Sequence, residues 1–112
     1  TELQILDTAE GLALAAGKAE LAQDMLHMLL ASLDQEVEAI RKALNQADQA
    51  LLIERVHRLH GASRYCGVPE LRHFCLQAEM RLKQQGDIRP AIDPLLAAIA
   101  RLQQAARDKA LL

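Results

Sequence analysis

The segment from Val56 to Val68, VHRLHGASRYCGV, holds the side chains in this 112-residue sequence that are best suited to chemistry. His57 and His60 lie three residues apart, and Gly61 follows His57 by one helical turn. A neutral imidazole has a free nitrogen lone pair, so it can act as a nucleophile, a base or a metal ligand. Glycine inside a helix costs about 1 kcal/mol relative to alanine. The position of this glycine beside a histidine therefore needs a physical reason.

A helical projection of this segment indicates which side chains face the core. The apolar stripe consists of Leu52, Val56, Leu59, Ser63 and Cys66. At about 100° per residue, His57 lies roughly 140° and Gly61 roughly 180° from Leu52, so both point away from the core. His60 and Arg64 lie beside His57, at roughly 80° and 120°. We therefore expect an exposed His57, with Gly61 leaving room for the backbone of a partner. The alternative interpretation is a surface histidine and a tolerated glycine.

The elements that must position these residues are helices. Apolar residues make up 51% of the chain, mostly Leu and Ala, and aromatic residues only 2%. The pattern of apolar residues, caps, glycines and prolines predicts helices over about 8–16, 18–45, 49–65, 69–85 and from 90 onward. The apolar stripe of the second, and longest, is Leu21, Met25, Met28, Leu29, Leu33, Val37, Ile40 and Leu44. The fold expected is all-α: an up-down-up-down four-helix bundle with a short extra N-terminal helix, forming a single domain over residues 1–112.

Several kinds of chemistry are not supported by residue spacing. The cysteines Cys66 and Cys75 lack the close pairing of structural zinc sites, and Cys66 lies on the apolar stripe. We therefore expect no metal site, and a bundle that binds metal through His57, His60 and a cysteine stays as an alternative. The run from Gly11 to Ala19 departs from a phosphate-binding loop in spacing and in its last residue, so we expect no ATP site.

Charge and composition also bear on possible partners. The net charge is −2; residues 1–48 carry −6 and residues 49–112 carry +4. These values predict no nucleic-acid partner, and the basic half either reflects chance or faces an acidic partner. No apolar run approaches the roughly 20 residues of a membrane span, and no signal peptide is visible. With only two cysteines, we expect a domain in a reducing, cytoplasmic compartment, without membrane contact.

The arrangement of these motifs resembles that of histidine-containing phosphotransfer (HPt) domains, over essentially the whole chain. The residues that carry the resemblance are His57, Leu59 and Gly61, followed by Gly67, Leu71 and Glu79. The start of the second helix, from Gly17-Lys18 to Met25-Leu26, is also similar to that family. The runs HRLHG and YCGVP are most similar to C-terminal HPt domains of BarA/GacS-type hybrid sensor histidine kinases.

The resemblance implies a role in a phosphorelay. His57 would accept a phosphoryl group from the aspartyl phosphate of a receiver domain and pass it to the aspartate of a response regulator. The domain itself would hold no cofactor, because the receiver supplies Mg²⁺, and it would be a monomer without kinase activity of its own. It would be a C-terminal fragment of a larger hybrid sensor kinase, on the cytoplasmic side of the inner membrane. A passive helical interaction domain, without covalent transfer, is the alternative.

The resemblance also implies supporting roles near His57. Arg58 and Arg64 are candidate cations toward the phosphoryl group or the receiver, and Gly61 would leave space for that partner. His60 stands where many family members carry Lys, so its support would be weaker and pH-dependent. Glu79, on the following helix, would either orient the His57 ring or face water.

Overall fold

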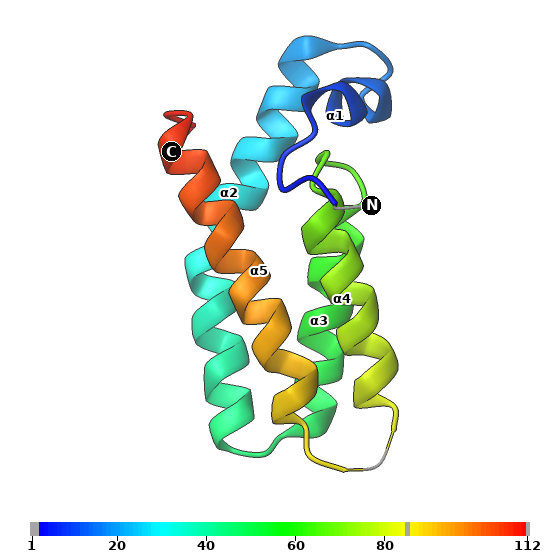
Figure 1. Ribbon diagram of the computed structural model, residues 1–112, viewed down its shortest axis with the longest axis vertical. Helices are drawn as coiled ribbons and strands as arrows, with labels where there is room; N and C mark the ends of the chain where they lie inside the picture. The colour runs from blue at the N-terminus through cyan, green and yellow to red at the C-terminus, as the bar shows by residue number, and fades with distance from the viewer. Residues whose placement is uncertain (1–2, 85, 112) are drawn as a thin grey trace.

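The computed structural model describes residues 3–84 and 86–111. Five helices follow one another along the chain: α1 (Thr8–Leu14), α2 (Ala19–Asn45), α3 (Gln49–Ser63), α4 (Pro69–Leu82) and α5 (Arg89–Asp108). Figure 1 shows α2 to α5 side by side with alternating directions, and each packs on the next while α5 closes the ring on α2. The short α1 packs against the first part of α2. The expected four-helix bundle with an extra N-terminal helix is confirmed, and the described residues contain no strand.

Local signals set most helix boundaries. The Asp7 carboxylate accepts a hydrogen bond from the Glu10 backbone N–H at 3.0 Å and caps α1. The Asp48 carboxylate caps α3 in the same way, through the N–H of Leu51. Pro69 occupies the first turn of α4, where its missing N–H has no cost. The predicted ends of the first, third and fourth helices are too late, because α1 ends at Leu14, α3 at Ser63 and α4 at Leu82.

A proline inside α5 is accommodated by a contact from α4. Pro94 has no N–H, so the carbonyl of Pro90 lacks its helical hydrogen bond. A guanidinium N–H of Arg81 donates to that carbonyl at 3.0 Å. The unsatisfied acceptor is thus paired, and α4 and α5 are joined near the start of α5.

The core consists mainly of aliphatic side chains from the four long helices. Its largest fully buried members are Leu33, Ile40, Leu52, Val56, Val68, Leu71, Cys75, Leu82, Ile92, Leu95, Ile99 and Leu102. Two residues that we expected on the apolar stripe of α2 are instead exposed: Leu21 at 43% and Met28 at 73%. They lie roughly 120° and 140° around the helix from Leu33. Residues linked by steps of three or four along the chain therefore do not all face the core in so long a helix.

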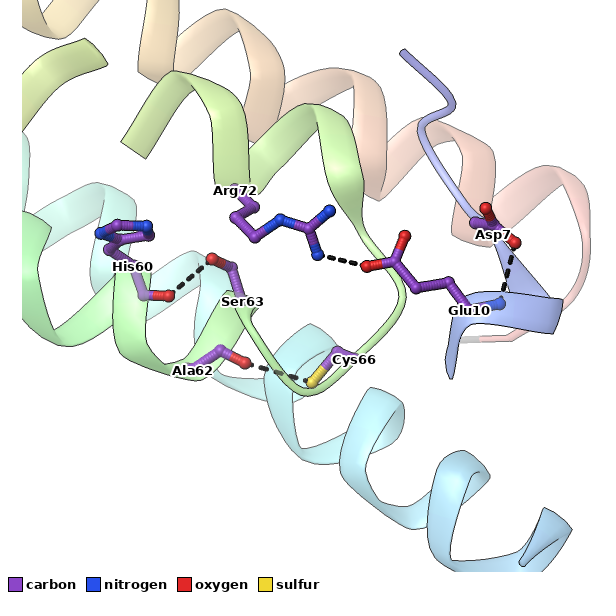
Figure 2. A network of polar contacts seen from close by, with 7 residues as sticks. All are labelled: Asp7, Glu10, His60, Ala62, Ser63, Cys66 and Arg72. Atoms are coloured by element: carbon purple, nitrogen blue, oxygen red, sulfur yellow. Dashed lines mark hydrogen bonds and ion pairs between the residues drawn. The ribbon is translucent and has the colours of Figure 1, made fainter. Parts of the chain in front are cut away.

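The turn between α3 and α4 receives the N-terminal segment. The backbone N–H of Asp7 donates to the Gly67 carbonyl at 2.8 Å, and the N–H of Glu70 donates to the Gln4 carbonyl at 3.0 Å. Figure 2 shows Arg72 of α4 paired with Glu10 of α1. These contacts hold α1 directly over the end of α3. Within the described residues, none of the helices has both the length and the apolar character of a membrane span.

Candidate functional site

His57 stands on the outer face of α3. Its neighbours Val56 and Leu59 are buried, whereas the His57 side chain is 76% exposed. The helical period therefore turns the imidazole outward, as the sequence predicts. A water-exposed imidazole is accessible to a partner protein without any movement of the bundle.

A carboxylate from α4 reaches the inner edge of this imidazole. Glu79 is 14% exposed, and its Oε1 lies 3.3 Å from Nδ1 of His57. The same oxygen lies 3.0 Å from Nδ1 of His60, and only this second contact has hydrogen-bond geometry. The sequence left open whether Glu79 orients the His57 ring or faces water. The structure shows its carboxylate in contact with both imidazoles and not in open water.

His60 does not lie beside His57 on the exposed surface, where the helical projection placed it. The residue is only 5% exposed. Its backbone carbonyl accepts a 2.7 Å hydrogen bond from the Ser63 hydroxyl, seen in Figure 2. At roughly 80° from Leu52, His60 is close enough to the apolar stripe for the neighbouring helix to reach it, and the interface between α3 and α4 covers the ring. A single helix cannot show this, because burial at a stripe edge depends on the neighbouring helix.

Gly61 borders open space. A Cβ atom built on Gly61 meets no heavy atom within 4 Å outside its own stretch of helix. Packing inside the domain therefore does not require a glycine at this position. The gap beside His57 is available to a partner.

Two arginines complete the exposed face of this region. Arg58 lies on α3 next to His57, and Arg64 caps its C-terminal end. Both residues are exposed, and neither forms an ion pair with another described residue. Their guanidinium groups are able to contact an acidic partner, as the resemblance implies.

The cysteines are buried in the bundle instead of contributing to a reactive site. Burial raises the pKa of the Cys66 thiol. Burial together with the nearby charge of Glu79 raises the pKa of Cys75 to about 12, although a hydrogen bond with Ser63 opposes this shift. Both thiols are therefore protonated near neutral pH and are poor nucleophiles. Over residues 3–84 and 86–111, no group of three or more His, Cys, Asp or Glu side chains could hold a metal ion.

The raised pKa of Cys75 predicts a loss of stability in alkali. A thiol that ionises more easily in the unfolded chain stabilises the fold fully below its unfolded pKa of about 8.5, and this contribution is lost as pH rises toward about 12. We expect the free energy of unfolding to fall by about 1 kcal/mol per pH unit from this group above pH 8.5 or so. Urea unfolding at several alkaline pH values measures the slope. Cys75→Ala should flatten it, and an unchanged slope in that variant would contradict the assignment.

Comparisons with known proteins agree with the geometry. A family model described as "Hpt domain" matches residues 24–106. Sensor histidine kinase GacS of Pseudomonas protegens is 60% identical over 110 residues, which cover 97% of this chain and 12% of that protein. Signal transduction histidine-protein kinase BarA of Escherichia coli is 35% identical over 94 residues, covering 81% of this chain and 10% of that protein.

A solved structure shows the same arrangement of helices. It is the HPT domain from an Hpt sensor hybrid histidine kinase of Shewanella, which is 40% identical with a TM-score of 0.84. The match covers 93% of this chain and 92% of that domain. The chain thus spans only about an eighth of the length of the full kinases but nearly all of an isolated domain. It belongs to the Hpt domain family, and its homology to hybrid sensor kinases supports phosphotransfer in a two-component system.

Proposed function

We propose that His57 is the phosphoacceptor, which takes a phosphoryl group from a receiver-domain aspartyl phosphate and passes it to a response-regulator aspartate. The observation that carries the proposal is the 76% exposed imidazole next to a glycine that borders open space. A receiver must bring its aspartate into line with the imidazole, and a protruding side chain on the next turn of α3 would obstruct it. The relatives' names as sensor kinases support this role.

The transfer needs one nucleophilic nitrogen and correct alignment. A lone pair of the His57 ring forms a bond to phosphorus, the bond from phosphorus to the aspartyl oxygen breaks, and the aspartate leaves as a carboxylate. In the second transfer, an aspartate oxygen attacks phosphorus and the imidazole leaves. Such reactions depend mainly on positioning and electrostatic stabilisation. Mg²⁺, supplied by the receiver, would neutralise the phosphoryl oxygens, and this domain would need no cofactor of its own.

The exposed arginines fit a receiver partner. Arg58 and Arg64 would meet an acidic surface around the receiver's aspartate. We further propose that the domain acts as a monomer, because one bundle forms a buried core to which each of the four long helices contributes apolar side chains. The names of its relatives, and the hybrid kinase that contains the Shewanella domain, support a place within a hybrid sensor kinase. We also propose that the domain lies on the cytoplasmic side of the membrane.

Two substitutions of Gly61 should have different effects on stability and on phosphoryl uptake. Gly61→Ala should raise the free energy of unfolding by up to about 1 kcal/mol, since alanine favours the helix and meets no neighbouring atom. Gly61→Gln should also fold, but its long side chain should slow phosphoryl uptake from a receiver by about tenfold or more. Urea unfolding and timed transfer assays measure the two effects. Normal uptake by Gly61→Gln would show that the open space has no role in docking.

The test of the proposed function is phosphoryl transfer itself. A receiver domain from a GacS-type kinase, radiolabelled on its aspartate, is mixed with the purified domain and Mg²⁺. Label should move to the domain as a phosphoramidate, which is lost in acid and retained in alkali, and ATP alone should give none. Receiver binding without transfer of label would instead support a passive interaction domain.

A further inference from the structure

Two large apolar side chains of α4 are exposed near the candidate site. Leu76 is 43% exposed and Met80 is 53% exposed, and they lie four residues apart on one side of the helix. We propose that Leu76 and Met80 form an apolar strip on which the receiver domain docks when it exchanges a phosphoryl group with His57. This inference rests on the proposed function of His57, and it adds a contact surface on a helix other than the one that carries the histidine.

The pairing of α3 with α4 places the apolar strip next to the site. The antiparallel register of the two helices is fixed by contacts along their interface: Gln49 with Leu82, His57 and His60 with Glu79, and Ser63 with Cys75. In this register, Met80 lies across from His57, and Leu76 lies across from Gly61. The imidazole and the glycine beside it are therefore each bordered by one member of the apolar strip.

Both side chains of the strip point out of the interface between α3 and α4. Glu79 marks the edge of α4 that packs on α3, and at about 100° per residue Leu76 lies roughly 60° and Met80 roughly 100° around the helix from it. The opposite edge of α4 borders α5 and carries the polar side chains His73, Gln77 and Arg81. The exposed apolar side chains of α4 therefore lie on the crest of the helix and on the edge nearer to the phosphoacceptor.

A receiver that reaches His57 must also cover the apolar strip. The carboxylate of Glu79 lies 3.3 Å from Nδ1 of His57, and Leu76 and Met80 precede and follow Glu79 on α4. A protein surface that closes over the imidazole therefore also lies on these two side chains. Removing their exposed apolar surface from water favours association, and the flexible side chain of Met80 can adapt to different partner surfaces. This suits a domain that must bind a donor receiver and an acceptor receiver in turn.

The charge beside the apolar strip favours the same partner. Arg64 lies three residues after Gly61 on α3, is exposed, and forms no ion pair with another residue in the described part of the chain. The acidic surface that we propose for the receiver would meet this guanidinium, while apolar side chains next to it would rest on the strip. The expected partner surface is thus an apolar segment flanked by acidic groups.

Glutamine substitutions in the apolar strip test the proposal, because they remove apolar surface and keep side chains of similar length. The dissociation constant for the unphosphorylated receiver of a GacS-type kinase should rise about fivefold for Leu76→Gln and for Met80→Gln, and about twentyfold for the double variant. The uptake rate at saturating receiver should stay within about twofold of the wild-type rate, since the strip contacts the receiver and not the reacting atoms. Titration calorimetry and timed transfer assays measure the two quantities.

Leu3→Gln is the matched control, because Leu3 is 45% exposed and lies against the C-terminal part of α5. It should leave the dissociation constant unchanged. An unchanged dissociation constant in the folded double variant would overturn the inference, and so would a loss of affinity confined to Met28→Gln, which would place the receiver on α2. If the double variant does not fold, Leu76→Ala and Met80→Ala carry the same expectation. Weaker binding in the double variant, with no transfer of label even to the wild-type domain, would contradict the proposed function alone.

Discussion

Phosphoryl uptake from a labelled receiver should be abolished by His57→Gln, with a loss of at least about 100-fold. Glutamine is close to histidine in size and polarity, but its amide nitrogen has no available lone pair to attack phosphorus. The fold should be unaffected to within about 0.5 kcal/mol, because the His57 side chain is 76% exposed and outside the core. Quantifying acid-labile label on the domain after a short incubation measures the effect.

The remaining exposed histidines provide matched controls. His27 on α2 and His73 on α4 are both exposed, so His27→Gln and His73→Gln make the same chemical change elsewhere on the bundle. Each should retain the wild-type rate of uptake. Label on folded His57→Gln, or loss of label in either control, would assign the phosphoacceptor to another residue.

Gly67→Ala should cause the largest loss of stability, about 2–4 kcal/mol. Gly67 adopts φ +67, a conformation that disfavours a side chain, in the turn between α3 and α4. A Cβ atom there would also lie 2.4 Å from the Asp7 carbonyl oxygen and 2.7 Å from the Gly11 backbone nitrogen. Because both obstacles are backbone atoms, α1 would have to move off the turn. Urea unfolding of the variant measures the loss.

Gly17→Ala separates the cost of a side chain at positive φ from the cost of a clash with neighbouring backbone atoms. Gly17 has φ +79, but a Cβ atom there meets nothing within 4 Å. It should therefore show only the conformational cost, about 1–2 kcal/mol. If Gly67→Ala were no more destabilising than Gly17→Ala, the close packing of α1 on this turn would not contribute to stability.

The register between helices decided which residues gather around His57. Glu79 lies 22 positions after His57 in the chain, and no local pattern places its carboxylate 3.3 Å from that ring. The docking of α1 on Gly67 is equally non-local, since no local pattern in the sequence brings Asp7 and Gly67 together. Distances between elements depend on how side chains of different helices interlock, which a single apolar stripe does not reveal.

By itself, the sequence determined the helices, their caps and the outward direction of His57, because those features follow from a 3.6-residue period and from neighbours within one turn. The tertiary structure alone decided that His60 is buried and joined to Glu79. At the edge of an apolar stripe, burial depends on whether another helix packs there. For His60, the interface between α3 and α4 covers the side chain.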